Sequence, residues 1–89
     1  MSLQQLRYFV AVAEEEHVGR AAERLRIAQP AISRQIRNLE AELGTTFFER
    51  TARGMRLSSS GAVFLPHARA ILSSIESATA AIRSGTRSA

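Results

Sequence analysis

The pattern of apolar positions predicts three short helices in the first 43 residues, because apolar side chains recur there at the spacing of helix faces. The first helix is expected from Leu3 to about Glu16, opened by a capping box of Ser2 and Gln5. Its buried stripe is predicted to consist of Leu3, Leu6, Phe9, Val10 and Ala13. We expect Tyr8 and Val12 to lie beside this stripe and to cover either the core or a partner.

The next two helices are predicted to form a helix-turn-helix. The first of them runs from about Val18 to Leu25, and a turn over residues 26–28 separates it from a helix that opens with Gln29 and Pro30. That helix buries the stripe Ile32, Ile36, Leu39 and Leu43, and Gly44 is suited to its C-cap. Its opposite side presents Pro30, Ser33, Arg34, Arg37 and Ala41. Short side chains with arginine near a helix start suit the DNA major groove.

Residues 45–57 change from a helical to a β-prone pattern. Thr46–Phe48 and Met55–Leu57 are predicted to pair as antiparallel strands, with Ala52, Arg53 and Gly54 at the tip. This hairpin is a small basic wing, surrounded by Arg50, Arg53 and Arg56. An arginine at such a tip can enter a narrow minor groove, and the alternative is a solvated hairpin.

From residue 58 onward the pattern predicts one long helix to about Ser84. Its apolar positions repeat as a heptad seam, which we take as a dimer interface in preference to an internal core: Phe64, Ala68, Ile71, Leu72, Ile75, Ala78 and Ile82. So long a stripe needs a partner, most simply a second copy. Pro66 is harmless if the helix starts near Phe64 and disruptive if it starts at Ser58. Residues 85–89 are expected to be a flexible tail.

Composition places the chain among small folded domains. It has 89 residues, 45% of them apolar, and no cysteine. No apolar run approaches a membrane span and the N-terminus lacks a signal-peptide pattern, so the cytoplasm is the expected location. Residues 20–56 hold eight of the twelve arginines but only four of the eight glutamates. A basic helix-turn-helix and wing favour a polyanionic partner. Glu14–Glu16 are interpreted as a solvated helix end, or alternatively as a face kept away from DNA.

Catalysis is not expected, because no nucleophile–base pair, phosphate-cradling loop or pair of acids is apparent. No cofactor is expected, and His17 and His67 have no ligand-type neighbours that would indicate a metal site. Three functions remain: a DNA-binding dimer, a winged-helix module for protein–protein interaction, and a basic helix on a membrane. The polar array of the third helix favours DNA, since a protein-binding face typically carries aromatic anchors. Residues 62–82 have too few cations for the membrane hypothesis.

The motifs AAERL, QPAISRQIRNLE, LG and FER, at this spacing, resemble the DNA-binding domain of the LysR-type transcriptional regulators over essentially the whole chain. The resemblance implies a mainly α fold, with a winged helix-turn-helix of three helices and a two-stranded wing in residues 1–57. A linker helix in residues 58–84 would pair antiparallel with its twin. It also implies that the effector-binding domain, where a small-molecule inducer would bind, is absent from this chain. The chain would form a homodimer, and a tetramer is the alternative for the full-length regulator.

The resemblance also assigns site residues. Bases would be read by Gln29, Pro30, Ser33 and Arg34, and Arg53 of the wing would enter the minor groove. Arg37 resembles a phosphate contact, and further candidates for phosphate are Arg20, Arg50 and Arg56, although Arg50 could instead brace the wing. The family usually has hydroxyl residues where this chain has His17, Gly19 and Ala28, so we expect two missing helix caps and one missing phosphate contact. The expected target is an interrupted dyad in double-stranded DNA.

Overall fold

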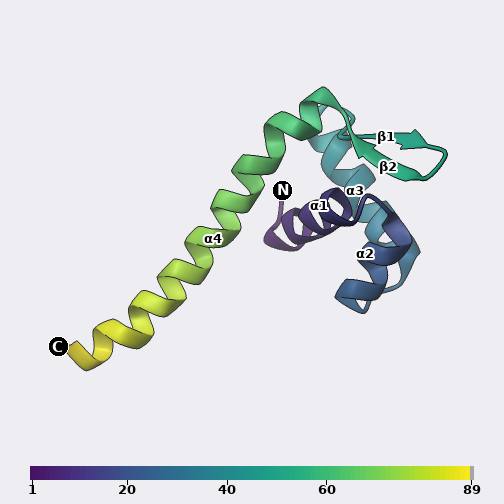
Figure 1. Ribbon diagram of the computed structural model, residues 1–89. Coiled ribbons are helices and arrows are strands. Elements are labelled where there is room, and N and C mark those ends of the chain that lie inside the picture. The colour runs from purple at the N-terminus through teal and green to yellow at the C-terminus, as the bar shows by residue number, and fades with distance from the viewer. Residues whose placement is uncertain (89) are drawn as a thin grey trace.

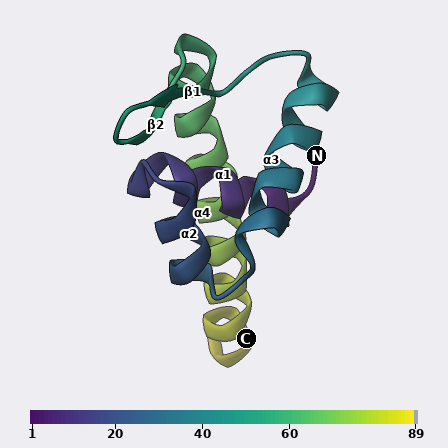
Figure 2. The same ribbon diagram turned by 90° about the vertical axis from the view of Figure 1, so that its right-hand side faces the viewer.

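The computed structural model describes the backbone of residues 1–88 and the side chains of residues 1–85. Three short helices come first: α1 (Leu3–Glu15), α2 (Val18–Leu25) and α3 (Gln29–Leu43). The strands β1 (Phe48–Thr51) and β2 (Gly54–Leu57) form the wing, and α4 (Ser59–Ser88) follows. Figure 1 shows α4 running away from a body made by the other elements, and Figure 2 shows that body from the side of α2, α3 and the wing. The predicted winged helix-turn-helix with a long linker helix is confirmed.

The helix ends are set by local capping. Ser2 and Gln5 form the predicted capping box, with hydrogen bonds of 3.1 and 3.0 Å. Glu16 ends α1 and Arg26 ends α2, both in the left-handed conformation, with φ of 54° and 58°. Gly44 ends α3 in the same conformation, as predicted. These caps turn the chain sharply between successive helices, which brings α1, α2 and α3 together.

The core is built around Phe9 of α1, which is fully buried. Its ring lies 5.0–5.4 Å from the rings of Phe47, Phe48 and Phe64, centroid to centroid. Phe47 also stacks on Phe64 at 4.8 Å, so the aromatic cluster joins α1, the segment before the wing and α4. Aromatic contacts of this kind contribute about 0.5–1.5 kcal/mol each beyond area burial. The cluster therefore holds the first half of α4 on the body.

Two predictions about the apolar stripes were resolved by packing. The side chains placed beside the α1 stripe belong to the core, since Tyr8 and Val12 are buried. Leu3 and Leu43, in contrast, were predicted to be buried and are exposed at 43% and 40%. Both lie at helix ends, where fewer neighbouring elements remain to cover a side chain.

The strand pairing of the wing lies nearer its tip than predicted. Four residue pairs join β1 and β2, from Phe48 opposite Leu57 to Thr51 opposite Gly54, so residues 46 and 47 are not part of the strand. Phe47 is instead drawn into the aromatic cluster, and the Phe47 amide donates to a carboxylate oxygen of Glu40 at 2.7 Å. Burying this ring takes precedence over extending the strand pair.

The structure decides where helix α4 begins and where it ends. It begins at Ser59, capped by Ser58, whose Oγ accepts from the Gly61 amide at 3.1 Å. Pro66 is therefore inside the helix, and the Ala62 carbonyl loses its usual i+4 donor. The described helix continues to Ser88, beyond the end near Ser84 that the sequence predicts, and Ala89 lies outside the described residues. The flexible tail over residues 85–89 stays a prediction.

The predicted heptad seam divides into two faces. Ala68 is fully buried within the chain, and the half-buried Phe64 belongs to the aromatic cluster, so both side chains pack on their own body. Their assignment to a dimer interface stays a prediction. Leu72 is partly buried against the same core. Ile71 and Ile82 are exposed at 40% and 69% and lack such cover. A heptad pattern alone does not distinguish a helix face turned to its own domain from one that is open.

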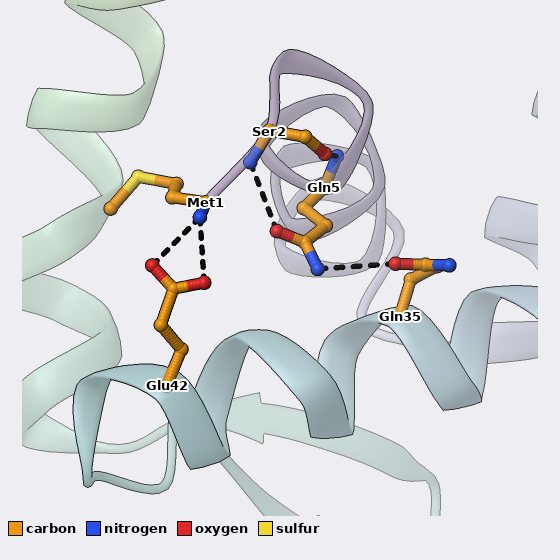
Figure 3. Close-up of polar contacts among 5 residues, drawn as sticks. All are labelled: Met1, Ser2, Gln5, Gln35 and Glu42. Carbon is orange, nitrogen blue, oxygen red and sulfur yellow. Dashed lines mark hydrogen bonds and ion pairs between the residues drawn. The ribbon is translucent and has the colours of Figure 1, made fainter.

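Polar contacts fix α3 against α1. Gln5 Nε2 donates to Gln35 Oε1 at 3.1 Å, and the terminal ammonium of Met1 lies 2.6 and 2.7 Å from the two carboxylate oxygens of Glu42 (Figure 3). These contacts lie along one side of α3 and leave its opposite side open. Among the residues that the structure describes, no helix is long and apolar enough to cross a membrane.

Candidate nucleic-acid interface

The sequence-predicted DNA contacts meet where the start of α3 faces the wing. One hollow, which we call the α3–wing hollow, is lined by residues of α2, α3 and the hairpin, among them Gly19, Gln29, Ser33, Arg50 and Arg53. Ser33 and Arg50 also line a second hollow, together with Arg37. Arg53 also lines a third, together with Arg20 and Arg56. The shared residues make the three hollows one continuous surface.

We call this surface the basic face and define it as Arg20, Gln29, Ser33, Arg37, Arg50, Arg53 and Arg56. It joins both halves of the helix-turn-helix to the wing, which sequence spacing alone does not bring together. The wing is anchored there by the Met55 amide, which donates to the Glu16 carbonyl at 3.0 Å. This contact sets the wing beside the start of α2.

Two predicted base contacts, Pro30 and Arg34, lie outside the three hollows. Both are exposed, on the first turns of α3 and next to Gln29 and Ser33 in sequence. Pro30 takes the first-turn position where its missing N–H removes no helix bond. Residues that project from the start of a helix, not those in its flanking hollows, are the ones that reach base edges when the helix enters a groove.

The arginines of the interface have few carboxylate partners. Within residues 1–85, no carboxylate lies within 4.0 Å of the guanidinium groups of Arg34, Arg37, Arg50 and Arg53. Arg56 pairs with Glu49 across the wing at 3.2 Å. The predicted brace within the wing is thus formed by Arg56, and Arg50 does not take that part. Exposed, unpaired guanidinium groups retain their charge and donors for an anionic ligand.

A backbone contact holds Arg20 in place within the basic face. Its guanidinium donates to the backbone carbonyl of Glu15 at 3.2 Å, and no carboxylate partner is found for it among the described side chains. It shares a hollow with Arg53 and Arg56, so three cations of separate sequence segments surround one depression. A phosphate there would meet several cations at once.

The acidic end of α1 forms ion pairs, and neither interpretation offered from the sequence described it. Glu14 lies 2.9 Å from guanidinium nitrogens of both Arg24 and Arg69, and Glu15 lies 3.3 Å from Arg24. Hydrogen bonds from Arg69 and then Arg24 hold the pKa of Glu14 below its ordinary value. The carboxylates thereby join α1 to α2 and α4.

His17 corrects the expectation of two lost helix caps. It is the N-cap of α2, and its Nδ1 accepts the Arg20 amide at 3.1 Å, so the imidazole replaces the hydroxyl that the family usually has there. Ala28, the N-cap of α3, makes no side-chain cap hydrogen bond, so that cap is missing as expected. His17 and Gly19 both line the α3–wing hollow, and their departure from the family pattern was the only sequence signal for them. No group of three or more potential metal ligands occurs among the described residues.

Comparison with known proteins places this geometry in a family. The profile described as "Bacterial regulatory helix-turn-helix protein, lysR family" matches residues 3–62. The HTH-type transcriptional regulator ClcR of Pseudomonas putida is 49% identical over 87 residues, which are 98% of this chain and 30% of ClcR. The chain thus spans about 30% of the length of that curated relative.

Solved structures agree with this assignment. The crystal structure of a CbnR DBD–DNA complex superposes with a TM-score of 0.90 at 42% identity, covering 97% of this chain and 99% of that one. A complex of the BenM DBD with catB site 1 DNA gives a TM-score of 0.92 at 42% identity, covering 97% of each chain. Family profile, sequence relatives and fold agree, and the chain belongs to the lysR family of bacterial regulatory helix-turn-helix proteins.

Proposed function

We propose that this chain binds double-stranded DNA sequence-specifically, as the operator-recognition part of a LysR-type transcriptional regulator. The observation that carries the proposal is the basic face, where unpaired arginines of α3 and the wing converge beside Gln29 and Ser33. Related chains of the same fold form complexes with DNA, as the names of the CbnR and BenM structures state. The relatives are transcriptional regulators, which is a non-enzymatic role.

The mechanism divides the interface by chemistry. The start of α3 enters the major groove, where bases are read by Gln29, Pro30, Ser33 and Arg34. Glutamine pairs in two-pronged fashion with adenine and arginine with guanine, so these side chains supply the choice of sequence. Arg53 at the wing tip enters the adjacent minor groove. Phosphates are held by Arg20, Arg37, Arg50 and Arg56, which supply affinity without sequence preference.

Protein–protein binding through the same surface is less well supported. All four phenylalanines of the chain belong to the buried cluster or pack against it, and Tyr8 is buried as well. The described part of the basic face therefore has no aromatic anchor of the type that dominates protein interfaces.

Dimerisation through α4 completes the proposal. The helix is about 45 Å long at about 1.5 Å per residue, and only its first half packs on the body. Ile71 and Ile82 remain exposed, and with Ile75 and Ala78 they form an apolar strip for a second copy, most simply antiparallel. Two recognition helices would then meet half-sites about 34 Å, or a multiple of it, apart on an interrupted dyad.

The DNA-binding and dimerisation roles divide the chain into two regions. Residues 1–57 bind DNA, and residues 58–84 form the dimer. Such a regulator acts where the bacterial chromosome lies, in the cytoplasm.

Selection of genomic fragments that bind the purified chain tests the proposal. We expect enrichment of a dyad with two half-sites, protected in footprinting as two major-groove segments with flanking minor-groove contacts. Equal retention of all fragments at matched salt would contradict sequence-specific binding and leave only the electrostatic term.

The dimer needs a separate test. An Ile82→Asp substitution places a charge on the apolar strip and should yield a monomer in sedimentation equilibrium. Ser73→Asp is the matched control, because Ser73 precedes Ile82 by nine residues and therefore lies on the opposite side of the helix. A dimer that survives Ile82→Asp would rule out this strip as the interface.

A further inference from the structure

Gly19 of α2 lies between two side chains of the α3–wing hollow. A Cβ at this position would come within 2.9 Å of His17 Cε1 and 3.2 Å of His17 Nδ1. It would also lie 3.4 Å from Gln29 Oε1. The first two distances are closer than ordinary van der Waals contact, so any larger residue at position 19 requires the ring of His17 to move.

The His17 ring is not free to move without cost. Its Nδ1 accepts the Arg20 amide at 3.1 Å and is the side-chain cap of α2. The ring also faces the wing, since a Cβ at Gly54 would lie 3.6 Å from His17 Cδ2. A displaced ring therefore either gives up the cap or presses on the wing.

Gln29 depends on the same space. It is the first residue of α3, it is exposed, and its amide oxygen lies over the position that a side chain at residue 19 would fill. Among the described residues the Gln29 side chain makes no hydrogen bond, so hydrogen bonding within the chain does not fix the direction of its amide. The surface made by Gly19 and the His17 ring is what limits where its amide can lie.

We propose that His17 and Gly19 are a matched pair of positioning residues, which together set the direction of the Gln29 amide for base reading. The inference rests on the proposed function, because it assigns a cause to the sequence preference of the same site. In this role neither residue touches DNA. The ring supplies a cap that fills the space beside α2, and the missing side chain at Gly19 leaves room for both the ring and the Gln29 amide. A side chain at position 19 breaks the match while the His17 ring is present, whereas a small capping residue at position 17 leaves room for that side chain.

A double-mutant cycle on sequence preference tests the pairing. The four proteins are the unmodified chain, Gly19→Ala, His17→Ser and the double variant, each bound to the selected operator and to operators changed at the position that Gln29→Ala identifies. We expect Gly19→Ala to lower discrimination at that position by about fivefold or more, the low end of the contribution of a two-pronged base contact. In the His17→Ser background, the same substitution should change discrimination less than about twofold, because the small cap leaves room for the methyl group.

Two further measurements separate positioning from general stability. In a Gln29→Ala background, Gly19→Ala should no longer change the preference, whereas an effect through stability would persist. His17→Asn, another small capping residue, should replace His17→Ser in the cycle with the same outcome, and circular dichroism should show a folded protein for every variant. Additive effects, or a loss of preference that persists without Gln29, would overturn the pairing while leaving operator binding intact. No preference in the unmodified chain would instead overturn the proposed function and this inference with it.

Discussion

Two groups of arginines on this molecule use the same side chain for different purposes. At the junction of α1, α2 and α4, Arg24 and Arg69 both contact Glu14 at 2.9 Å. The other group comprises Arg34, Arg37, Arg50 and Arg53. Among the described residues, no carboxylate lies within ion-pair distance of these four guanidinium groups. Paired arginines connect helices, and unpaired arginines keep their donors for a ligand. Apart from Arg56, which pairs with Glu49 within the basic face, the distribution of glutamate therefore distinguishes the structural surface from the binding surface.

Gly54 packs the wing against Glu16 at the end of α1, and its substitution should have the largest effect. Gly54→Ala places a Cβ against the Glu16 carbonyl at a φ of 145°, a conformation that L side chains rarely adopt. We expect a loss of about 1–3 kcal/mol in the free energy of unfolding, together with weaker DNA binding because the wing must move. Urea denaturation and titration of operator DNA measure the two effects.

Gly44→Ala is the matched control for Gly54→Ala. Gly44 also has a positive φ, of 66°, but no atom lies within 4 Å of a Cβ built there. It should therefore cost stability without weakening operator binding. If both variants bind DNA equally well, the position of the wing does not matter for binding.

Arg34→Ala should have the next largest effect, and on binding alone. Removal of a base-reading arginine should cost about 1–3 kcal/mol of operator affinity and relax the sequence preference. The melting temperature should stay within error of the unmodified chain, because Arg34 is exposed and unpaired. Equal losses on operator and random DNA would instead make Arg34 a phosphate contact.

Arg37→Ala should have a smaller effect of another kind. A lost phosphate contact lowers affinity to about the same degree on every sequence, and reduces the slope of log affinity against log salt by about 1. Fluorescence anisotropy titrations at several salt concentrations measure this slope. Arg24→Ala provides the comparison, since a paired arginine behind the interface should leave the slope unchanged.

Glu14→Gln should have the smallest effect and should depend on pH. The pKa of Glu14 is lowered below its ordinary 4.5 by hydrogen bonds from Arg69 and Arg24, so its stabilisation is fully present above pH 4.5. It is lost as the pH falls through the lower pKa of the folded state. Because all three side chains are about a third or more exposed, the contribution is about 1 kcal/mol or less. The difference in melting temperature between the two proteins should vanish in acid, and a difference that grew there would contradict the assignment.

The sequence by itself determined the three short helices and, to within a residue, their ends. The bounds of α2 and α3, the Ser2–Gln5 capping box and the C-cap at Gly44 follow from residues adjacent in the chain. Capping and helical periodicity are local, so no tertiary contact is needed to predict them. The candidate contacts of α3 and the wing also followed from the sequence, largely through the family motif that Gln29 to Arg34 carry.

Only the tertiary structure decided which apolar side chains are buried within the chain and what they pack against. The heptad pattern of α4 does not say that Ala68 and Phe64 turn to their own core while Ile82 stays exposed, because that depends on where Phe9 and Phe47 lie. The sequence likewise does not predict that His17 replaces a hydroxyl cap, or that Gly61 lets α4 approach the Phe47 carbonyl. Periodicity specifies that a face is buried, and close packing between distant segments specifies what buries it.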